Sequence, residues 1–261
     1  MKTWHFIGIL LPLLGCSHGS PAENEAQVQQ NKNVPIIMES PEPIQEMAVP
    51  NPNQKQDQHQ QRKSKALLNV PLIKQNPELK YGCEVTSLAM MLNFAGADTN
   101  KMKLFKEIQK DNDPLKRSAN GDILSWGNPA EGFVGDMTGR RAGYAVFDKP
   151  MVDLINRYLP GRAVNLTGKD FEEVLDHVSA GYPAVVWTTG DYRLPDRWES
   201  WTHGNEVIKT PLDLHAVVLV GFNETTVYLN DPLSGRKQVP VNKNRFIETW
   251  KAMQSRAVSY R

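Results

Sequence analysis

The chain has 261 residues, a formal net charge of +1 and a hydrophobic share of 40%. This near-neutral balance argues against nucleic acid as a partner, and no apolar run reaches the roughly 20 residues that cross a bilayer. The composition allows one hydrophobic core of ordinary size, with apolar residues unevenly spread along the chain.

The first sixteen residues, MKTWHFIGILLPLLGC, predict an export signal. A basic Lys2 precedes a short apolar run from Phe6 to Leu14, which is typical of a secretory signal. The Leu-Leu-Gly-Cys at its end resembles the bacterial lipobox, which implies cleavage before Cys16 and acylation of its thiol. The alternative is an ordinary signal peptide with an incidental cysteine. We expect residues 1–16 to be a lipoprotein signal and the protein to be lipid-anchored on the outer face of the bacterial cytoplasmic membrane or in the cell envelope.

Residues 17–65 form a second region of distinct composition. They are dominated by Gln, Asn, Lys and Pro, as in NPNQKQDQHQQRKSK. Such a segment buries too little apolar surface to offset its chain entropy. We expect a disordered polar tether, followed by one folded domain over residues 66–261.

The first half of this domain is predicted to be mainly helical. Apolar residues recur at helical spacing from Glu84 to Phe94, and Gly96 can end that helix. Thr99 or Asn100 can cap the next helix. The elements expected up to residue 159 are a short strand at 67–73, helices at 84–94 and 101–110, a long irregular loop at 111–141 and a helix at 151–159.

The second half is predicted to be mainly strands. The segment 182–189 has the β-branched content of a buried strand, and two apolar runs flank a tight connection at Asn223-Glu224. The remaining elements are expected to be a strand at 163–167, a helix at 170–181, a polar Trp-rich loop at 191–206, strands at 214–222, 225–232 and 237–241, and a helix at 244–253. Because the helices come mainly in the first half of the domain and the antiparallel strands come late in the sequence, we expect an α+β fold.

Cys83 is the first candidate for chemistry. If Cys16 carries lipid, Cys83 is an unpaired thiol in an exported protein. It begins a predicted helix, where the positive end of the helix dipole lowers a thiol pKa, and Gly82 leaves room for a substrate backbone. Glu84 beside it would disfavour a thiolate unless its side chain points away. The alternative is a small buried hydrophobe on a helix.

A nucleophilic cysteine needs a base, usually histidine. Of six histidines, three lie before residue 66 and one lies on the acidic helix 170–181, which leaves His203 and His215. In the predicted hairpin, His215 and Asp231 share a face, so Asp231 can orient the imidazole and complete a Cys-His-Asp triad with Cys83. The alternatives are a hydrogen-bonded core histidine and a turn-opening Asp-Pro.

Two further sets of residues are candidates for the same site. Gln75 lies eight residues before Cys83, where its amide could stabilise an oxyanion together with the Cys83 N–H; Asn76 is a competitor. A possible substrate cleft is formed by residues of the predicted loops, whose rings suit stacking on a peptide or glycan: Trp126, Trp198, Trp201 and His203. The alternative is that the tryptophans pin these loops to the body of the domain.

The order of these residues resembles the C39-like peptidase family, a papain-like group. The resemblance rests on Gln75, then Gly82-Cys83 at the start of a helix, His215 at the start of an apolar strand, and Asn230-Asp231-Pro232 after the next strand. LNVPLIKQNPELKYGCEVTSLAMMLNFAG is similar to its exported bacterial branch, and the likeness spans about residues 67–249. The resemblance implies a papain-like fold with the nucleophile helix packed on the late antiparallel sheet. It also implies the family's Gln, Cys, His and Asp roles for Gln75, Cys83, His215 and Asp231. One departure is Glu84, where many relatives have glycine.

The resemblance implies a cell-envelope cysteine peptidase that hydrolyses peptide bonds through a thioester acyl-enzyme. One alternative is a catalytically inert surface lipoprotein that uses the fold as a binding module, and another is a cell-wall peptide amidase or transpeptidase. The expected partners are a peptide or protein substrate, including cell-wall peptide, and the membrane through the lipid anchor. No cofactor or metal is expected, because no cluster of His, Cys and carboxylates shows ligand spacing along the chain and no Gly-rich phosphate loop occurs.

Overall fold

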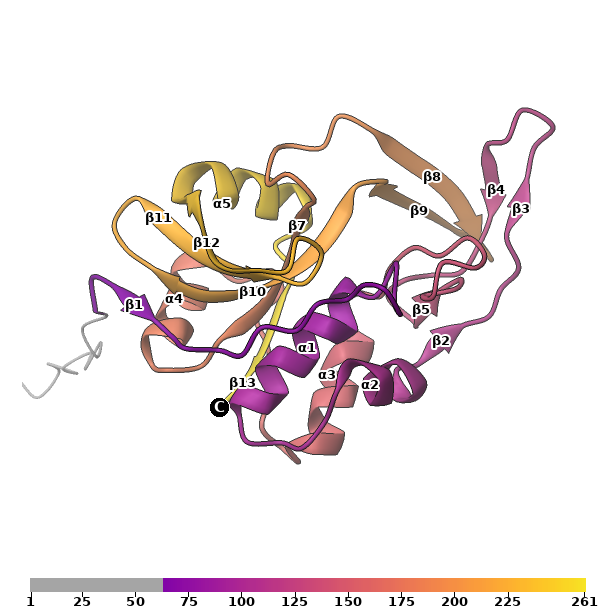
Figure 1. Ribbon diagram of the computed structural model, residues 1–261. Helices are drawn as coiled ribbons and strands as arrows, with labels where there is room; N and C mark the ends of the chain where they lie inside the picture. The colour runs from indigo at the N-terminus through magenta and orange to yellow at the C-terminus, as the bar shows by residue number, and fades with distance from the viewer. Residues whose placement is uncertain (1–62) are drawn as a thin grey trace, which may run out of the picture. The chain divides into compact units, whose positions relative to one another are not determined.

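The computed structural model of the protein describes residues 63–261, which fall within one compact unit. The predicted signal, Cys16 and all but the end of the predicted tether lie outside the described residues. The folded part is built on one large sheet with helices on both of its faces (Figure 1).

The large sheet has seven strands in the order β12-β11-β10-β7-β13-β6, with β1 also paired to β10. All of its pairings are antiparallel. Its strands are β1 (Ala66–Leu67), β6 (Ala163–Asn165), β7 (Ala184–Thr189), β10 (Leu214–Phe222), β11 (Thr226–Asp231), β12 (Arg236–Asn242) and β13 (Ala257–Tyr260). The late antiparallel sheet of the predicted α+β fold is therefore present, with β10 and β7 near its centre.

Alternate residues of β7 divide the core between the two faces of the sheet. Val185 and Trp187 pack with the helices on one face, and Ala184 and Val186 pack with those on the other, as the period of two in a strand requires. The first face carries α1 (Cys83–Phe94), α2 (Lys101–Glu107) and α3 (Asp148–Tyr158), and the second carries α4 (Phe171–Ser179) and α5 (Lys243–Ala252). Buried on both faces, β7 reads as a continuous apolar run.

The segment 111–141, predicted as one long loop, contains three short strands and the end of a fourth, and the predicted Trp-rich loop 191–206 contains the first strand of a hairpin. The elements are β2 (Lys110–Asp111), β3 (Lys116–Arg117), β4 (Ile123–Ser125), β5 (Phe133–Val134), β8 (Trp198–His203) and β9 (Glu206–Pro211). They form a two-stranded sheet, β2-β5, and a four-stranded sheet, β3-β4-β8-β9. These small sheets project from one side of the large sheet (Figure 1).

The element ends follow the capping residues. The Asn100 side chain accepts hydrogen bonds from the backbone N–H groups of Met102 and Lys103, so Asn100 and not Thr99 caps α2. Gly96, with φ +86°, follows the end of α1 as predicted. Several elements are shorter than predicted. For example, α2 ends at Glu107 and the first strand spans only two residues.

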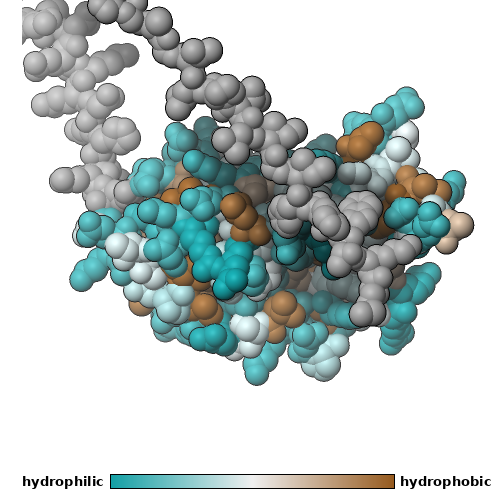
Figure 2. All heavy atoms as spheres, turned by 90° about the horizontal axis from the view of Figure 1, so that it is seen from above, coloured by the Kyte–Doolittle hydropathy of each residue, from teal (hydrophilic) through white to brown (hydrophobic). Residues whose placement is uncertain are grey.

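Where Figure 2 shows the described residues, hydrophobic residues are scattered among hydrophilic ones. Within residues 63–261, none of the helices combines the length and the apolar character needed to cross a bilayer.

Candidate active site

Cys83 is the first residue of α1 and is buried. One turn further on, the Ser87 hydroxyl donates to the carbonyl oxygen of Ala216 on β10 at 3.1 Å. Ala216 follows His215, so this bond fixes the first turn of α1 against the part of the sheet that carries the histidine. A Cβ at Gly82 would lie 2.5 Å from Cβ of Leu79, so glycine lets the chain enter α1 tightly.

His215 and Asp231 form a buried hydrogen-bonded pair. The His215 Nε2 lies 2.7 Å from Oδ1 of Asp231. Val218 pairs with Asn230 across β10 and β11, so His215 reaches Asp231 diagonally on one face of the hairpin. The structure thus brings the predicted pair together. With Nε2 donating to the carboxylate, Nδ1 is the ring nitrogen left to act as a base.

Asp231 is held ionised by its neighbours. Burial alone would raise its pKa, but the hydrogen bond and charge of His215 outweigh burial and hold the pKa well below its usual range. The Tyr192 hydroxyl donates to Oδ2 at 3.1 Å, and the backbone N–H of Leu233 donates to Oδ1 at 2.9 Å. These bonds fix the carboxylate in the position that orients the imidazole.

Glu84 does not point away from the thiol. The Cys83 thiol donates to Oε2 of Glu84 at 3.3 Å, and the backbone N–H of Val146 donates to Oε1 at 3.2 Å. Glu84 is fully buried, and none of the ion pairs within residues 63–261 involves it. Burial raises the pKa of Glu84 to about 7, against the lowering by backbone hydrogen bonds.

The Cys83 thiol is therefore neutral in this arrangement. Burial raises its pKa well above the usual value, and the negative charge of Glu84 raises it further. The predicted lowering by the start of the helix is outweighed, because desolvation penalises the thiolate more than the helix dipole favours it.

Gln75 lies beside the same corner of the sheet. Its backbone N–H donates to the carbonyl of Pro232 at 2.9 Å, next to Asp231, and its side-chain Nε2 donates to the carbonyl of Lys80 at 2.9 Å. Gln75 is buried, whereas its competitor Asn76 is exposed. Over residues 63–261, Nε2 of Gln75 makes no second hydrogen bond, and an amide with a spare N–H suits an oxyanion.

The predicted cleft residues separate into two groups. Trp126 and Trp201 are buried together, with ring centroids 5.9 Å apart, and the Trp201 indole N–H donates to the carbonyl of Gly127 at 2.9 Å. Such burial favours the alternative in which these two rings pin the small sheets. Trp198 is half exposed, and His203 lies among carboxylates, which no sequence spacing had predicted.

A cysteine at the start of a helix, packed on an antiparallel sheet that presents a His-Asp pair, is the constellation expected of a papain-like cysteine peptidase. Residues 67–258 match the model of the Peptidase_C39-like family, and the chain belongs to this family. This match confirms the resemblance drawn from the sequence.

Two relatives extend the match. The uncharacterized protein YvpB of Bacillus subtilis (strain 168) is 36% identical over 182 residues, which cover 70% of each chain. A crystal structure of a Bacillus anthracis protein assigned to the C39-like peptidases is 42% identical and superposes with a TM-score of 0.70, covering 76% of this chain and 98% of that one. The predicted fold class is confirmed.

Proposed function

We propose that the protein is a cysteine peptidase in which Cys83 is the nucleophile, His215 the general base and acid, and Asp231 the residue that orients the imidazole. The observation that carries the proposal is the buried His215–Asp231 hydrogen bond of 2.7 Å. This bond lies next to the point where the Ser87–Ala216 bond fixes the first turn of the Cys83 helix.

The reaction then proceeds in two stages. Nδ1 of His215 takes the Cys83 proton, the sulfur bonds to the substrate carbonyl carbon, and the carbonyl oxygen becomes an oxyanion. The backbone N–H of Cys83 and the spare amide N–H of Gln75 stabilise that oxyanion. His215 next protonates the leaving amine as the C–N bond breaks. Water, deprotonated by His215, finally attacks the thioester and releases the acid and the thiol.

The protonation state of Glu84 affects the first step of this reaction, the loss of the Cys83 proton. The thiol donates to Glu84 in the described arrangement, so the proton has to pass to His215 instead. An ionised Glu84 would oppose the thiolate by like-charge repulsion. We infer that catalysis requires the protonated, neutral form of Glu84.

The test uses the full chain with Cys16→Ser, so that Cys83 is the only thiol of the two in the sequence. A peptide aldehyde and a chloromethyl ketone serve as trapping reagents, and a peptide library and an unfolded protein serve as substrates. We expect Cys83→Ala to abolish trapping, and both Cys83→Ala and His215→Ala to lower kcat/KM by about 10³-fold or more.

A different result would contradict the proposed mechanism. A folded protein whose Cys83 is trapped no faster than free cysteine, and which is indifferent to His215→Ala, would contradict the proposal. Binding without catalysis, the first alternative, would then be the better account. A transpeptidase would instead transfer the acyl group to an added amine in preference to water, which mass spectrometry of the products distinguishes.

A further inference from the structure

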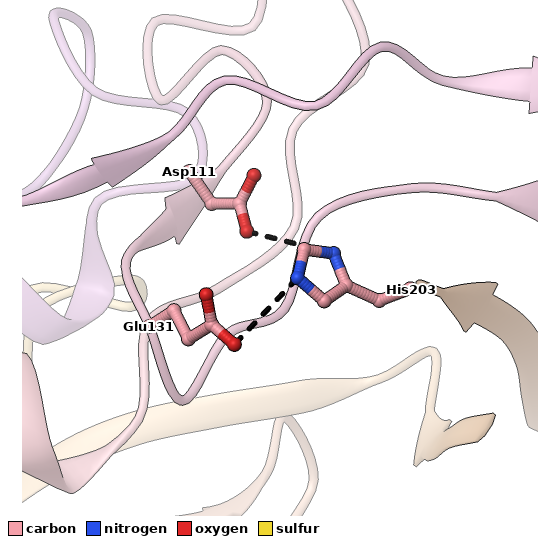
Figure 3. Close-up of side chains that lie close together, drawn as sticks. All are labelled: Asp111, Glu131 and His203. Carbon is pink, nitrogen blue, oxygen red and sulfur yellow. Dashed lines mark ion pairs between the residues drawn. The ribbon is translucent and has the colours of Figure 1, made fainter. Parts of the chain in front are cut away.

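The small sheets bring together three metal-ligating side chains from distant parts of the chain. Asp111 ends β2, Glu131 lies in the loop before β5, and His203 ends β8. One ligand atom of each lies within 4.8 Å of the other two. The two carboxylates face the imidazole (Figure 3). Nothing in the proposed peptide hydrolysis uses this cluster.

Within residues 63–261, the cluster carries more negative charge than the neighbouring side chains balance. Asp113 Oδ2 lies 3.4 Å from Nδ1 of His203, and the Asn128 side-chain amide holds Glu131 and Glu206 together, 3.3 Å from an oxygen of each. Over residues 63–261, no ion pair joins these carboxylates to a lysine or arginine. Among these residues, three carboxylates therefore share a single imidazole, which balances at most one of their charges.

The orientation of His203 is fixed from outside the cluster. Its Nδ1 lies 3.3 Å from the carbonyl oxygen of Trp126, which can only accept, so Nδ1 carries the proton. This leaves Nε2 to face Oε1 of Glu131 at 3.6 Å. A metal-ligating histidine characteristically donates its second ring N–H to a carbonyl or carboxylate in this way.

The distance from Nε2 to Glu131 fits a shared cation better than a direct bond. At 3.6 Å it exceeds the usual N–H···O range, which ends at about 3.2 Å. Two ligands bound to one Zn²⁺ at about 2.0–2.2 Å lie roughly 3–3.6 Å apart.

The backbone holds the buried ligand rigidly. Oδ1 of Asp111 accepts from the backbone N–H of Asp113 and Oδ2 accepts from that of Asn128, both at 2.9 Å. A Cβ at Gly127 would lie 2.7 Å from Cγ of Asp111, and a Cβ at Gly132 would lie 2.6 Å from its backbone nitrogen. The two glycines therefore allow the loop to close around the carboxylate, which is fixed before any ion arrives.

We propose that Asp111, Glu131 and His203 bind one divalent transition-metal ion of the Zn²⁺ or Mn²⁺ type. An imidazole together with carboxylates suits these ions, whereas Ca²⁺ is usually held by oxygen alone. The ion would join β2, the loop before β5 and β8, and so cross-link the two small sheets. Its role is structural, and the proposal is independent of the peptidase activity.

The test measures binding of Zn²⁺ alone to the tag-free, chelator-treated full chain carrying Cys16→Ser and Cys83→Ala, which removes both thiols as competing ligands. We expect calorimetry to show one Zn²⁺ per chain and the Tm to rise with Zn²⁺ concentration. Glu131→Gln and His203→Gln should each weaken this binding by about tenfold or more. Glu248→Gln, the same change at an exposed position of α5, should leave it unchanged.

The side chain of Glu131 is 59% exposed, so Glu131→Gln should leave the Tm of the metal-free protein unchanged. Any effect of this substitution on the titration then reflects metal binding and not folding. Absence of stoichiometric Zn²⁺ binding, or binding that both ligand variants leave intact, would overturn the site. If Mn²⁺ replaces Zn²⁺ with the same dependence on Glu131 and His203, the proposal holds. If Ca²⁺ binds there and neither Zn²⁺ nor Mn²⁺ does, the proposed class of ion is wrong.

Discussion

Glu84 shows how a single buried carboxyl can control the protonation of a neighbouring thiol. It is packed between the Cys83 thiol and the backbone N–H of Val146, and burial raises its pKa to about 7. The group is therefore neutral in mildly acidic solution and acquires its charge near neutrality. Tyr144, whose pKa is also raised by burial and is affected by the charge of Glu84, stays protonated over the same range.

Peptidase activity should consequently fall as the pH rises above about 7, because ionised Glu84 opposes the Cys83 thiolate. Glu84→Gln should remove this decline and keep activity at pH 8 to 9, as measured by kcat/KM across pH. Glu248→Gln is the matched control and should retain the wild-type profile. A decline that persists unchanged in Glu84→Gln would assign it to another group.

Glu84 should also make stability depend on pH. Its folded pKa lies above the unfolded value of 4.5, so its contribution to folding is complete below about 4.5 and is lost as the pH rises through about 7. We expect the drop in Tm between pH 4.5 and 7.5 to be smaller in Glu84→Gln than in the unmodified protein. An identical drop in both would show that Glu84 is ionised in the fold.

Asp231 should show the opposite dependence. Its folded pKa is lower than the unfolded value of 3.8, so it stabilises the fold above about pH 4, and this stability is lost as the pH falls further. Asp231→Asn should flatten the acid limb of a Tm-against-pH curve and lower kcat/KM by about 10²–10⁴-fold at pH 7. Asp98→Asn, at an exposed position, should do neither.

Residue pairs that follow from strand geometry could be predicted, and side-chain orientations that depend on packing could not. The period of two in a strand places His215 and Asp231 on one face of the hairpin, so their proximity followed from the sequence. The direction of Glu84 depends on the N–H of Val146, 62 residues away. The sign of the shift in the Cys83 pKa depends in turn on that direction and on burial.

The prediction missed strand β8, which lies in the segment expected to be a polar Trp-rich loop, and strand β9, most of which was assigned to no element, for a physical reason. Half of the residues of each strand are exposed, and of β8 only Trp201 is fully buried. A strand that is polar on both faces lacks the alternation that reveals strands in sequence. The cation site was missed in the same way, because Asp111, Glu131 and His203 meet only after this hairpin pairs with β4.

The start of α1 depends on a close contact that only glycine permits. In Gly82→Ala the added Cβ would meet Leu79 at 2.5 Å, so the first turn of α1 has to shift relative to β10. We expect a loss of about 1–3 kcal/mol of stability and a disproportionate loss of kcat/KM, measured by denaturant unfolding and peptide hydrolysis.

Gly190→Ala is the matched control for this change. A Cβ at Gly190 meets nothing within 4 Å, and this glycine does not have a positive φ. Equal effects of the two substitutions would show that the contact with Leu79 does not position Cys83.

The expected location of the whole protein in the cell is inferred from the sequence of residues 1–16. We propose export and acylation at Cys16, which would hold the peptidase domain at the membrane. Labelling of growing cells with an alkyne fatty acid should mark the wild-type chain and not Cys16→Ser, and only the wild type should sediment with membranes. Equal labelling of both would rule out the lipobox.

The position of β13 has a consequence for how the molecule is made. This strand, near the C-terminus, lies between β7 and β6 inside the sheet, and all four of its residues are buried. β7 pairs on its other side with β10, which carries His215. A nascent chain that has emerged only to residue 252 therefore contains Cys83 and His215 but not the strand that fills the sheet between β7 and β6. Deleting residues 257–261 should leave a protease-sensitive chain without activity, so the proposed peptidase would stay latent during synthesis until β13 is released.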